Sequence, residues 1–125
     1  PVTLLVEEIE NIIQAVDMSK KYALRDKAIL SLLYASGVRV SELTDLKLMS
    51  LLLQEGFIRV FGKGEKERIV PLGKKAIVHM KNYLYELRQM MVKEGNSEGF
   101  VFLNRNNILS VEDTKIPYPV WTIST

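Results

Sequence analysis

The sequence has 125 residues, enough for one domain with a single core, and its 47% hydrophobic and 26% charged residues are typical of a globular protein. It contains no cysteine and a single histidine, His79, which excludes disulfides, thiolate metal sites and a histidine-rich metal site. No apolar run reaches the roughly 20 residues that a membrane-spanning helix needs, so no membrane partner is expected.

The formal net charge of +2 is spread unevenly along the chain. Residues 1–17 carry four acidic side chains and no basic one, whereas residues 59–81 carry seven basic and two acidic ones. A basic block of this kind is typical of a surface that binds a polyanion. The alternative is a solvated charged face without a partner.

Apolar residues at helical spacing predict a helix over residues 6–16 and a second one from about residue 24 to residue 36. Gly37 is expected to end the second helix, because only glycine enters the left-handed conformation cheaply. The breadth of the apolar face of the second helix predicts that it is mostly core.

A short third helix is predicted over residues 41–47, with Ser41 as its N-cap. Arg39 then lies in the connection just before this helix, close to backbone N–H groups that also attract an anion. Glu42, in the first turn, is placed to hold Arg39 or to cap the backbone. An Arg39–Glu42 pair that only fixes the corner is the simpler interpretation of the same residues.

Three short β-prone runs follow and predict a small antiparallel sheet. They cover residues 51–53, 57–61 and 68–70. Ile58 and Val60 should share one face of the middle strand, and a sheet this small must pack on helices to be stable. The turn at residues 62–67 is charged and flanked by glycine, so it can present a mobile cation.

A long helix is predicted from about residue 74 to residue 93, where apolar residues recur at i, i+3 and i+4. His79 lies near its apolar face and is expected to be a partly buried or surface histidine rather than a ligand. Residues 100–103 are expected to form a short apolar strand or anchor. The fold class is therefore α+β, mainly α, with helices packed on a small three-stranded antiparallel sheet.

Three blocks of the sequence resemble the catalytic domain of tyrosine site-specific recombinases, in particular the bacterial Xer-type enzymes and related phage integrases. The blocks are RDKAIL (residues 25–30), LYASGVRVSEL (33–43) and GKGEKERIVPLG (62–73). Their order and the 24 positions from Arg39 to Lys63 make the match specific. We expect residues 1–104 to be a partial catalytic domain and residues 105–125 to be an irregular tail that does not match the family.

The resemblance implies a protein that cuts one DNA strand through a phosphotyrosine bond and rejoins it, without a metal or cofactor. Arg39 matches the catalytic arginine that binds the scissile phosphate bidentately, and Glu42 matches the acidic residue that steadies it. Lys63 matches the hairpin lysine that protonates the leaving oxygen. Backbone contacts to DNA are expected from four further cations: Arg59, Lys66, Arg68 and Lys74.

The family's later motif, His-x-x-Arg followed by a second His or Trp and the nucleophilic tyrosine, has no counterpart in this sequence. No histidine follows His79, and Arg105 has no histidine three positions before it. We therefore expect DNA binding without strand cleavage by these residues alone. A gene truncated or frameshifted after residue 105 and a fragment of a longer protein both explain this pattern. The alternative function is a non-enzymatic DNA-binding or regulatory module derived from a recombinase.

The resemblance further implies double-stranded DNA and other recombinase protomers as partners, in the bacterial cytoplasm at the nucleoid. Without the later helices of the domain an apolar face should stay open. This predicts self-association or marginal stability.

Overall fold

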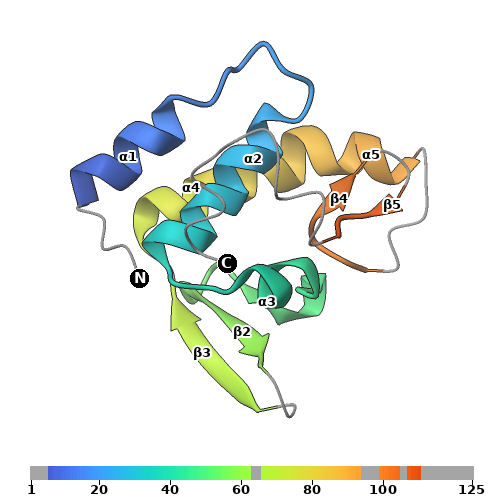
Figure 1. Cartoon of the computed structure of the whole chain (residues 1–125). Coiled ribbons are helices and arrows are strands. Elements are labelled where there is room, and N and C mark those ends of the chain that lie inside the picture. The colour runs from blue at the N-terminus through green and yellow to red at the C-terminus, as the bar shows by residue number, and fades with distance from the viewer. Residues whose placement is uncertain (1–5, 63–65, 94–98, 105–106, 111–125) are drawn as a thin grey trace.

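The computed structural model describes residues 6–62, 66–93, 99–104 and 107–110 (Figure 1). The described helical elements are α1 (Val6–Gln14), α2 (Ala23–Leu30), the π-helical segment η1 (Ser31–Ala35), α3 (Val40–Thr44), the 3-10 segment η2 (Leu48–Ser50), α4 (Lys74–Asn82), the π-helical segment η3 (Tyr83–Arg88) and α5 (Gln89–Lys93). The described strands are β1 (Leu51–Leu52), β2 (Phe57–Phe61), β3 (Glu67–Pro71), β4 (Leu103–Asn104) and β5 (Asn107–Ile108). These elements confirm the predicted α+β class with a three-stranded antiparallel sheet.

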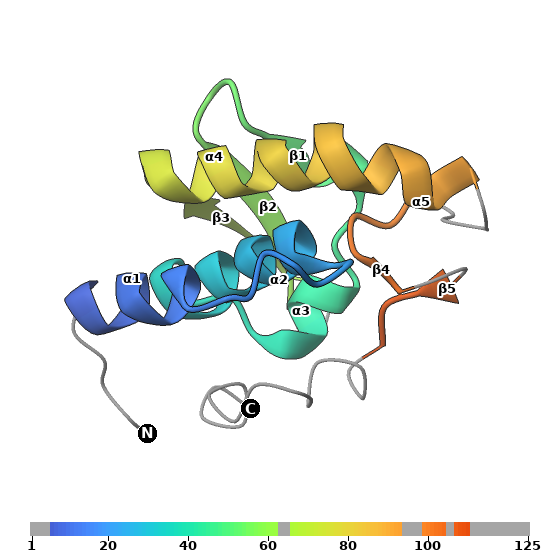
Figure 2. The same ribbon diagram turned by 90° about the horizontal axis from the view of Figure 1, so that it is seen from above.

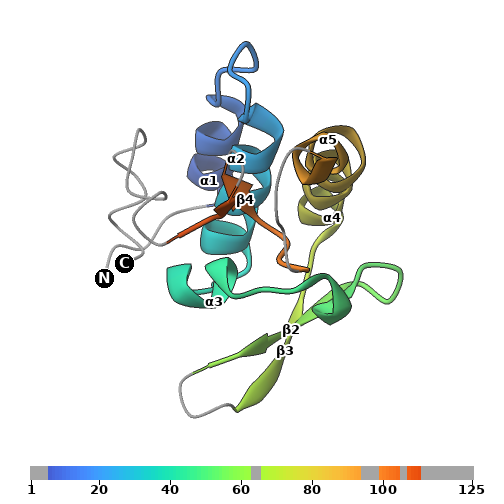
Figure 3. The same cartoon turned by 90° about the vertical axis from the view of Figure 1, so that its right-hand side faces the viewer.

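Helix α2 is the centre of the helical layer, because it packs against α1 and also against α4 and η3. Seen from above, α4, η3 and α5 run as one long rod beside α1 and α2 (Figure 2). The β2–β3 hairpin extends away from this helical layer (Figure 3). The core is centred on α2, where Ala28, Ile29 and Leu30 are completely buried.

The three-stranded sheet has β2 in the middle, in the order β1-β2-β3. Across the hairpin, Ile58 pairs with Val70 and Val60 pairs with Arg68. Ile58 and Val60 are both buried, which confirms the predicted inner face of the middle strand. Strand β3 lies at the edge and ends at Pro71, a residue whose missing N–H suits that place.

Both of the longer predicted helices contain a π-helical stretch, which the spacing of apolar residues in the sequence does not indicate. The second predicted helix is α2 followed by η1, and the long one is α4, η3 and α5 in succession. A π-helical stretch widens the turn and so rotates the residues after it, and Tyr83 and Arg88 become the buried residues of η3. The predicted helix end at Gly37 is confirmed, because its φ is +71° and the Val38 N–H donates back to the Leu32 carbonyl at 3.1 Å.

Helix α3 differs from the prediction in its start and its cap. It covers Val40–Thr44 instead of residues 41–47, and its N-cap is Arg39, so the prediction of Ser41 as N-cap is wrong. The physical reason is that the Glu42 carboxylate accepts the backbone N–H of Arg39 at 3.0 Å. An acidic residue three positions into the helix thus holds the start of α3 without a serine cap.

The chain around residue 100 is anchored in the core. Leu46 accepts a hydrogen bond from the Val101 N–H, and the Leu48 N–H donates to the Gly99 carbonyl, both at 2.9 Å. This pairing fixes the connection between α3 and η2 against the segment around residue 100. Residues 101–103 are buried, in agreement with the predicted apolar anchor.

The described part of the predicted tail also contacts the core. Strand β5 pairs with β4, and Leu109 is only 2% exposed within the core cluster. The boundary after residue 104 stays a prediction, and residues 111–125 of that tail lie outside the described residues.

Candidate functional site

Arg39 lies at the corner where η1 gives way to α3. Its backbone is extended, with φ −78° and ψ 154°, and its side chain is exposed to solvent. Among the residues that the structure describes, its guanidinium has no hydrogen-bond or ion-pair partner. The residue predicted to hold a phosphate therefore presents a free, planar cation at the surface.

Glu42 is the centre of this corner, and its ion-pair partner is Arg68. The Glu42 side chain is only 5% exposed, whereas that of Arg68 is 45% exposed. Arg68 Nη2 donates to Glu42 Oε1 at 2.9 Å, and Arg68 Nη1 pairs with Glu42 Oε2. Instead of a side-chain pair between Arg39 and Glu42, the structure shows Glu42 joining the Arg39 backbone to the Arg68 guanidinium.

Hydrogen bonding from Arg68 is the main cause that holds the pKa of the Glu42 carboxyl below its usual value. The Arg39 N–H and the charges of both arginines act in the same direction, while burial opposes them. The pKa of Arg68 is raised in turn, chiefly by its hydrogen bonds to Glu42. Glu42 is thus a buried carboxylate kept ionised by two arginines.

The glycine at the base of the hairpin tip allows this arrangement to form. A Cβ placed on Gly62 would lie 3.3 Å from Glu42 Oε2, closer than ordinary side-chain contacts. The Gly62 N–H donates to the Lys66 carbonyl at 2.9 Å, which closes the tip. Lys63, the predicted general acid, follows Gly62 directly and lies outside the described residues.

The other predicted DNA contacts differ in how free their charges are. Lys66 and Lys74 are exposed. Arg59 is half-buried, with Nε 3.4 Å from Glu67 Oε1 and Nη2 3.4 Å from the Met49 carbonyl. The structure therefore brings Arg39 and the hairpin base together at Glu42.

Sequence reasoning missed Arg68 as the partner of Glu42. The two residues are 26 positions apart, one on a helix and one on a strand, so no periodicity connects them. The one available signal was the glycine before Lys63, which indicates a close approach of backbone to another group.

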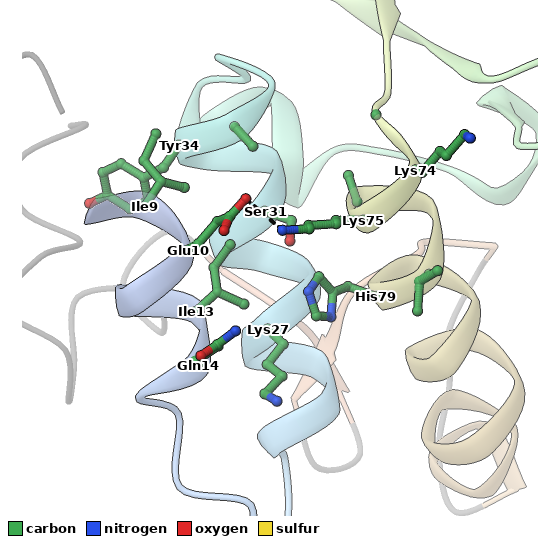
Figure 4. Close-up of a pocket in the computed structure, with 14 residues that line it drawn as sticks. Ile9, Glu10, Ile13, Gln14, Lys27, Ser31, Tyr34, Lys74, Lys75 and His79 are labelled. Atoms are coloured by element: carbon green, nitrogen blue, oxygen red, sulfur yellow. Dashed lines mark hydrogen bonds and ion pairs between the residues drawn. The ribbon is translucent and has the colours of Figure 1, made fainter. Parts of the chain in front are cut away.

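A cavity of about 700 Å³ lies between α1, α2 and α4, and Lys74 is the one predicted DNA contact among its described lining residues (Figure 4). Lys75 Nζ pairs with Glu10 Oε1 at 2.7 Å across it. His79 lines the cavity and is half-buried; burial, and then the charges of Lys27 and Lys75, lower its pKa. This agrees with the expectation of a partly buried histidine.

Within the described ranges, no group of three or more His, Asp or Glu side chains is placed to hold a metal ion. The described helices also include none that is long and apolar enough to cross a membrane.

The model of the phage integrase family matches residues 3–116 of this chain. The tyrosine recombinase XerD of Listeria innocua is 44% identical over 106 residues, which cover 85% of this chain and 36% of the relative. XerD of Chlorobaculum tepidum is 48% identical over 107 residues, covering 83% of this chain and 35% of the relative. The chain therefore spans about a third of the length of these relatives.

Two solved structures are similar in fold. The crystal structure of XerA recombinase superposes with a TM-score of 0.71 and 35% identity, over 90% of this chain and 38% of that chain. The XerH site-specific recombinase bound to its difH substrate superposes with a TM-score of 0.69 and 26% identity, over 88% of this chain and 33% of that chain. These likenesses agree with the predicted partial recombinase domain.

Proposed function

This chain belongs to the phage integrase family, and we propose that it binds duplex DNA as part of a tyrosine site-specific recombinase. The observation that carries the proposal is the exposed guanidinium of Arg39, which has no partner among the described residues. It lies beside the base of the β2–β3 hairpin, which Arg68 joins to Glu42. A planar guanidinium can bind two oxygens of one phosphate at once, which gives both affinity and orientation.

In this proposal Arg39 binds the phosphate at the cleavage site and stabilises the charge that develops on it. Lys63 approaches from the hairpin tip and donates a proton to the leaving 5′-oxygen. Exposed Lys66 and Lys74, together with Arg59, contact neighbouring phosphates and so set the position of the duplex. Other protomers of the recombinase would bind the same DNA, in the bacterial cytoplasm at the nucleoid.

These 125 residues should bind DNA without cutting it. Cleavage in this family needs a tyrosine nucleophile and further cationic groups, and the His-x-x-Arg motif that precedes that tyrosine has no counterpart in this sequence. Positioning groups cannot replace the nucleophile, because without it no covalent intermediate forms.

The test is a titration of a fluorescent DNA duplex at several salt concentrations. We expect affinity to fall steeply with salt, and Arg39→Met to weaken binding roughly 10- to 100-fold, the value of a charge-assisted contact. The matched control is Lys20→Met, an exposed cation in the connection between α1 and α2, which lies on the other side of the molecule from the hairpin (Figure 1). Equal losses for the two variants would contradict a phosphate site at Arg39.

A nicked suicide duplex tests the absence of cleavage. We expect no covalent adduct between chain and DNA, and an adduct would show that one of the five tyrosines is a nucleophile. When the chain alone gives no adduct, adding the C-terminal part of a XerD relative, which carries the tyrosine, should produce one. Failure of that complementation would favour a DNA-binding module without recombinase activity.

A further inference from the structure

Three hydrogen bonds from two arginines reach the Glu42 carboxylate at this corner. Oε1 accepts the Arg39 N–H at 3.0 Å and Arg68 Nη2 at 2.9 Å, and Oε2 pairs with Arg68 Nη1. The two arginines therefore bind the same carboxylate through different groups. Arg68 uses its side chain, and Arg39 uses only its backbone.

This division matters because Arg39 is a second candidate partner for the Glu42 carboxylate. They are three positions apart at the start of α3, and the charge of Arg39 already acts on the Glu42 carboxyl. Removing the cationic partner of a carboxylate whose side chain is only 5% exposed strongly disfavours its ionised form. If Arg68 were absent, the other described cation that acts on the Glu42 carboxyl is Arg39, whose guanidinium has no partner among the described residues.

We propose that Arg68 is a positioning residue that occupies Glu42 and thereby keeps the guanidinium of Arg39 free for a phosphate. The inference deepens the proposed function, because the phosphate in question is that of the DNA bound there. It assigns Arg68 a role different from the direct DNA contact that the sequence indicated. The packing at Gly62 supports it, since a Cβ there would lie 3.3 Å from Glu42 Oε2, a tight contact that glycine avoids.

The first test needs no DNA. The side-chain carboxyl of Glu42 is titrated by carbon-detected NMR in the wild type, Arg68→Met and Arg39→Met/Arg68→Met. We expect the pKa of Glu42 to stay below its usual value in Arg68→Met, because Arg39 takes over the pairing, and to rise only in the double variant. A pKa that rises fully in Arg68→Met, with no further change on removing Arg39, would overturn the proposal.

The second test measures DNA affinity and its salt dependence. Arg68→Met should weaken binding roughly 10-fold or more and lower the magnitude of the slope of log K against log salt by about 0.9, the loss of one phosphate contact. Glu42→Gln/Arg68→Met should restore both, because a neutral amide no longer captures Arg39. A merely structural role for Arg68 would leave the slope of the folded protein unchanged.

The control is Lys66→Met, an exposed cation on the same hairpin, with and without Glu42→Gln. Its loss of affinity should not be rescued by the second change. If Glu42→Gln/Arg68→Met binds as weakly as Arg68→Met, Arg68 is itself a phosphate contact and the proposal is wrong. If Arg68→Met does not fold, Arg68→Gln is measured in its place, and unfolding in urea is recorded for every variant.

The two tests distinguish a failure of the role proposed for Arg68 from a failure of the proposed DNA binding. A wild type that shows no salt-dependent DNA binding would remove the proposed function, while the NMR titration would still decide whether Arg68 keeps Arg39 free.

Discussion

Neighbouring cations help to shift the pKa values of two side chains in this protein, Glu42 and His79. Glu42 lies between two arginines, and its pKa is lowered. His79 lies in a cavity wall near Lys27 of α2 and Lys75 of α4, and its pKa is lowered too. The same positive surroundings thus favour the charge of the acid and disfavour the charge of the histidine.

His79 gives a prediction for stability against pH. Because its pKa in the folded chain is below the usual value of 6.5, protonation favours the unfolded state. Stability should therefore fall as pH drops below about 6.5, and the loss should level off below the folded-state pKa. His79→Gln should remove this part of the pH dependence, measured as the difference in urea midpoints between pH 7.5 and pH 5.

The neighbouring charges supply the control. Of the two described cations that act on His79, Lys27 has the larger effect, and Lys75 is paired with Glu10 across the cavity. Lys27→Met should reduce the pH dependence without abolishing it. Identical pH profiles for the wild type and His79→Gln would contradict the prediction.

Among the elements, the rod formed by α4, η3 and α5 is tied to the segment around residue 101 through its π-helical stretch. The Tyr83 hydroxyl donates to the Val101 carbonyl at 2.7 Å and accepts the Leu103 N–H at 3.2 Å. Arg88 Nε donates to the Val101 carbonyl at 3.0 Å and to that of Phe100 at 3.1 Å. These bonds give side-chain partners to backbone groups of residues 100, 101 and 103.

Removing the Tyr83 hydroxyl should be costly. Tyr83→Phe keeps the ring, which stacks on Phe102 with centroids 5.3 Å apart, but it leaves the buried Leu103 N–H without its partner and removes one of the two donors to the Val101 carbonyl. We expect the free energy of unfolding to fall by about 1–3 kcal/mol. The matched control is Tyr85→Phe, in the same segment but 64% exposed, which should have little effect. Equal effects in urea unfolding would show that the hydroxyl bonds do not stabilise the fold.

For the molecule as a whole, the core continues past the predicted domain boundary at residue 104. Leu109 joins the same core cluster as the residues of α2, and the family model also continues, to residue 116. At the surface several large apolar side chains are exposed, among them Met49 at 76% and Met90 at 64%. Self-association through such side chains stays a prediction.

Leu109 tests how far the cooperative unit extends. Leu109→Ala should lower the free energy of unfolding by about 2–5 kcal/mol, the usual cost of a cavity in a core. Leu48→Ala, at a position that is 39% exposed, should cost much less. If Leu109→Ala unfolds at the same urea concentration as the wild type, the segment after residue 104 does not stabilise the domain.

Much of this fold could be predicted from local patterns in the sequence. The helices before Gly37 and after Gly73, the β2–β3 hairpin and its buried face depend on residues close together in the chain, where period and turn chemistry act. The motif around Arg39 likewise indicated the family correctly.

The rest depended on contacts between distant parts of the chain. The pairing of Glu42 with Arg68, the turn of Tyr83 and Arg88 towards residues 100–103, and the burial of Leu109 arise when separate elements pack together. A buried charge or hydroxyl takes whichever partner packing brings within reach, and no local period encodes that choice. The sequence therefore singled out Arg39 as the candidate for a phosphate site, whereas packing in three dimensions paired Glu42 with Arg68 and left the Arg39 guanidinium without a partner among the described residues.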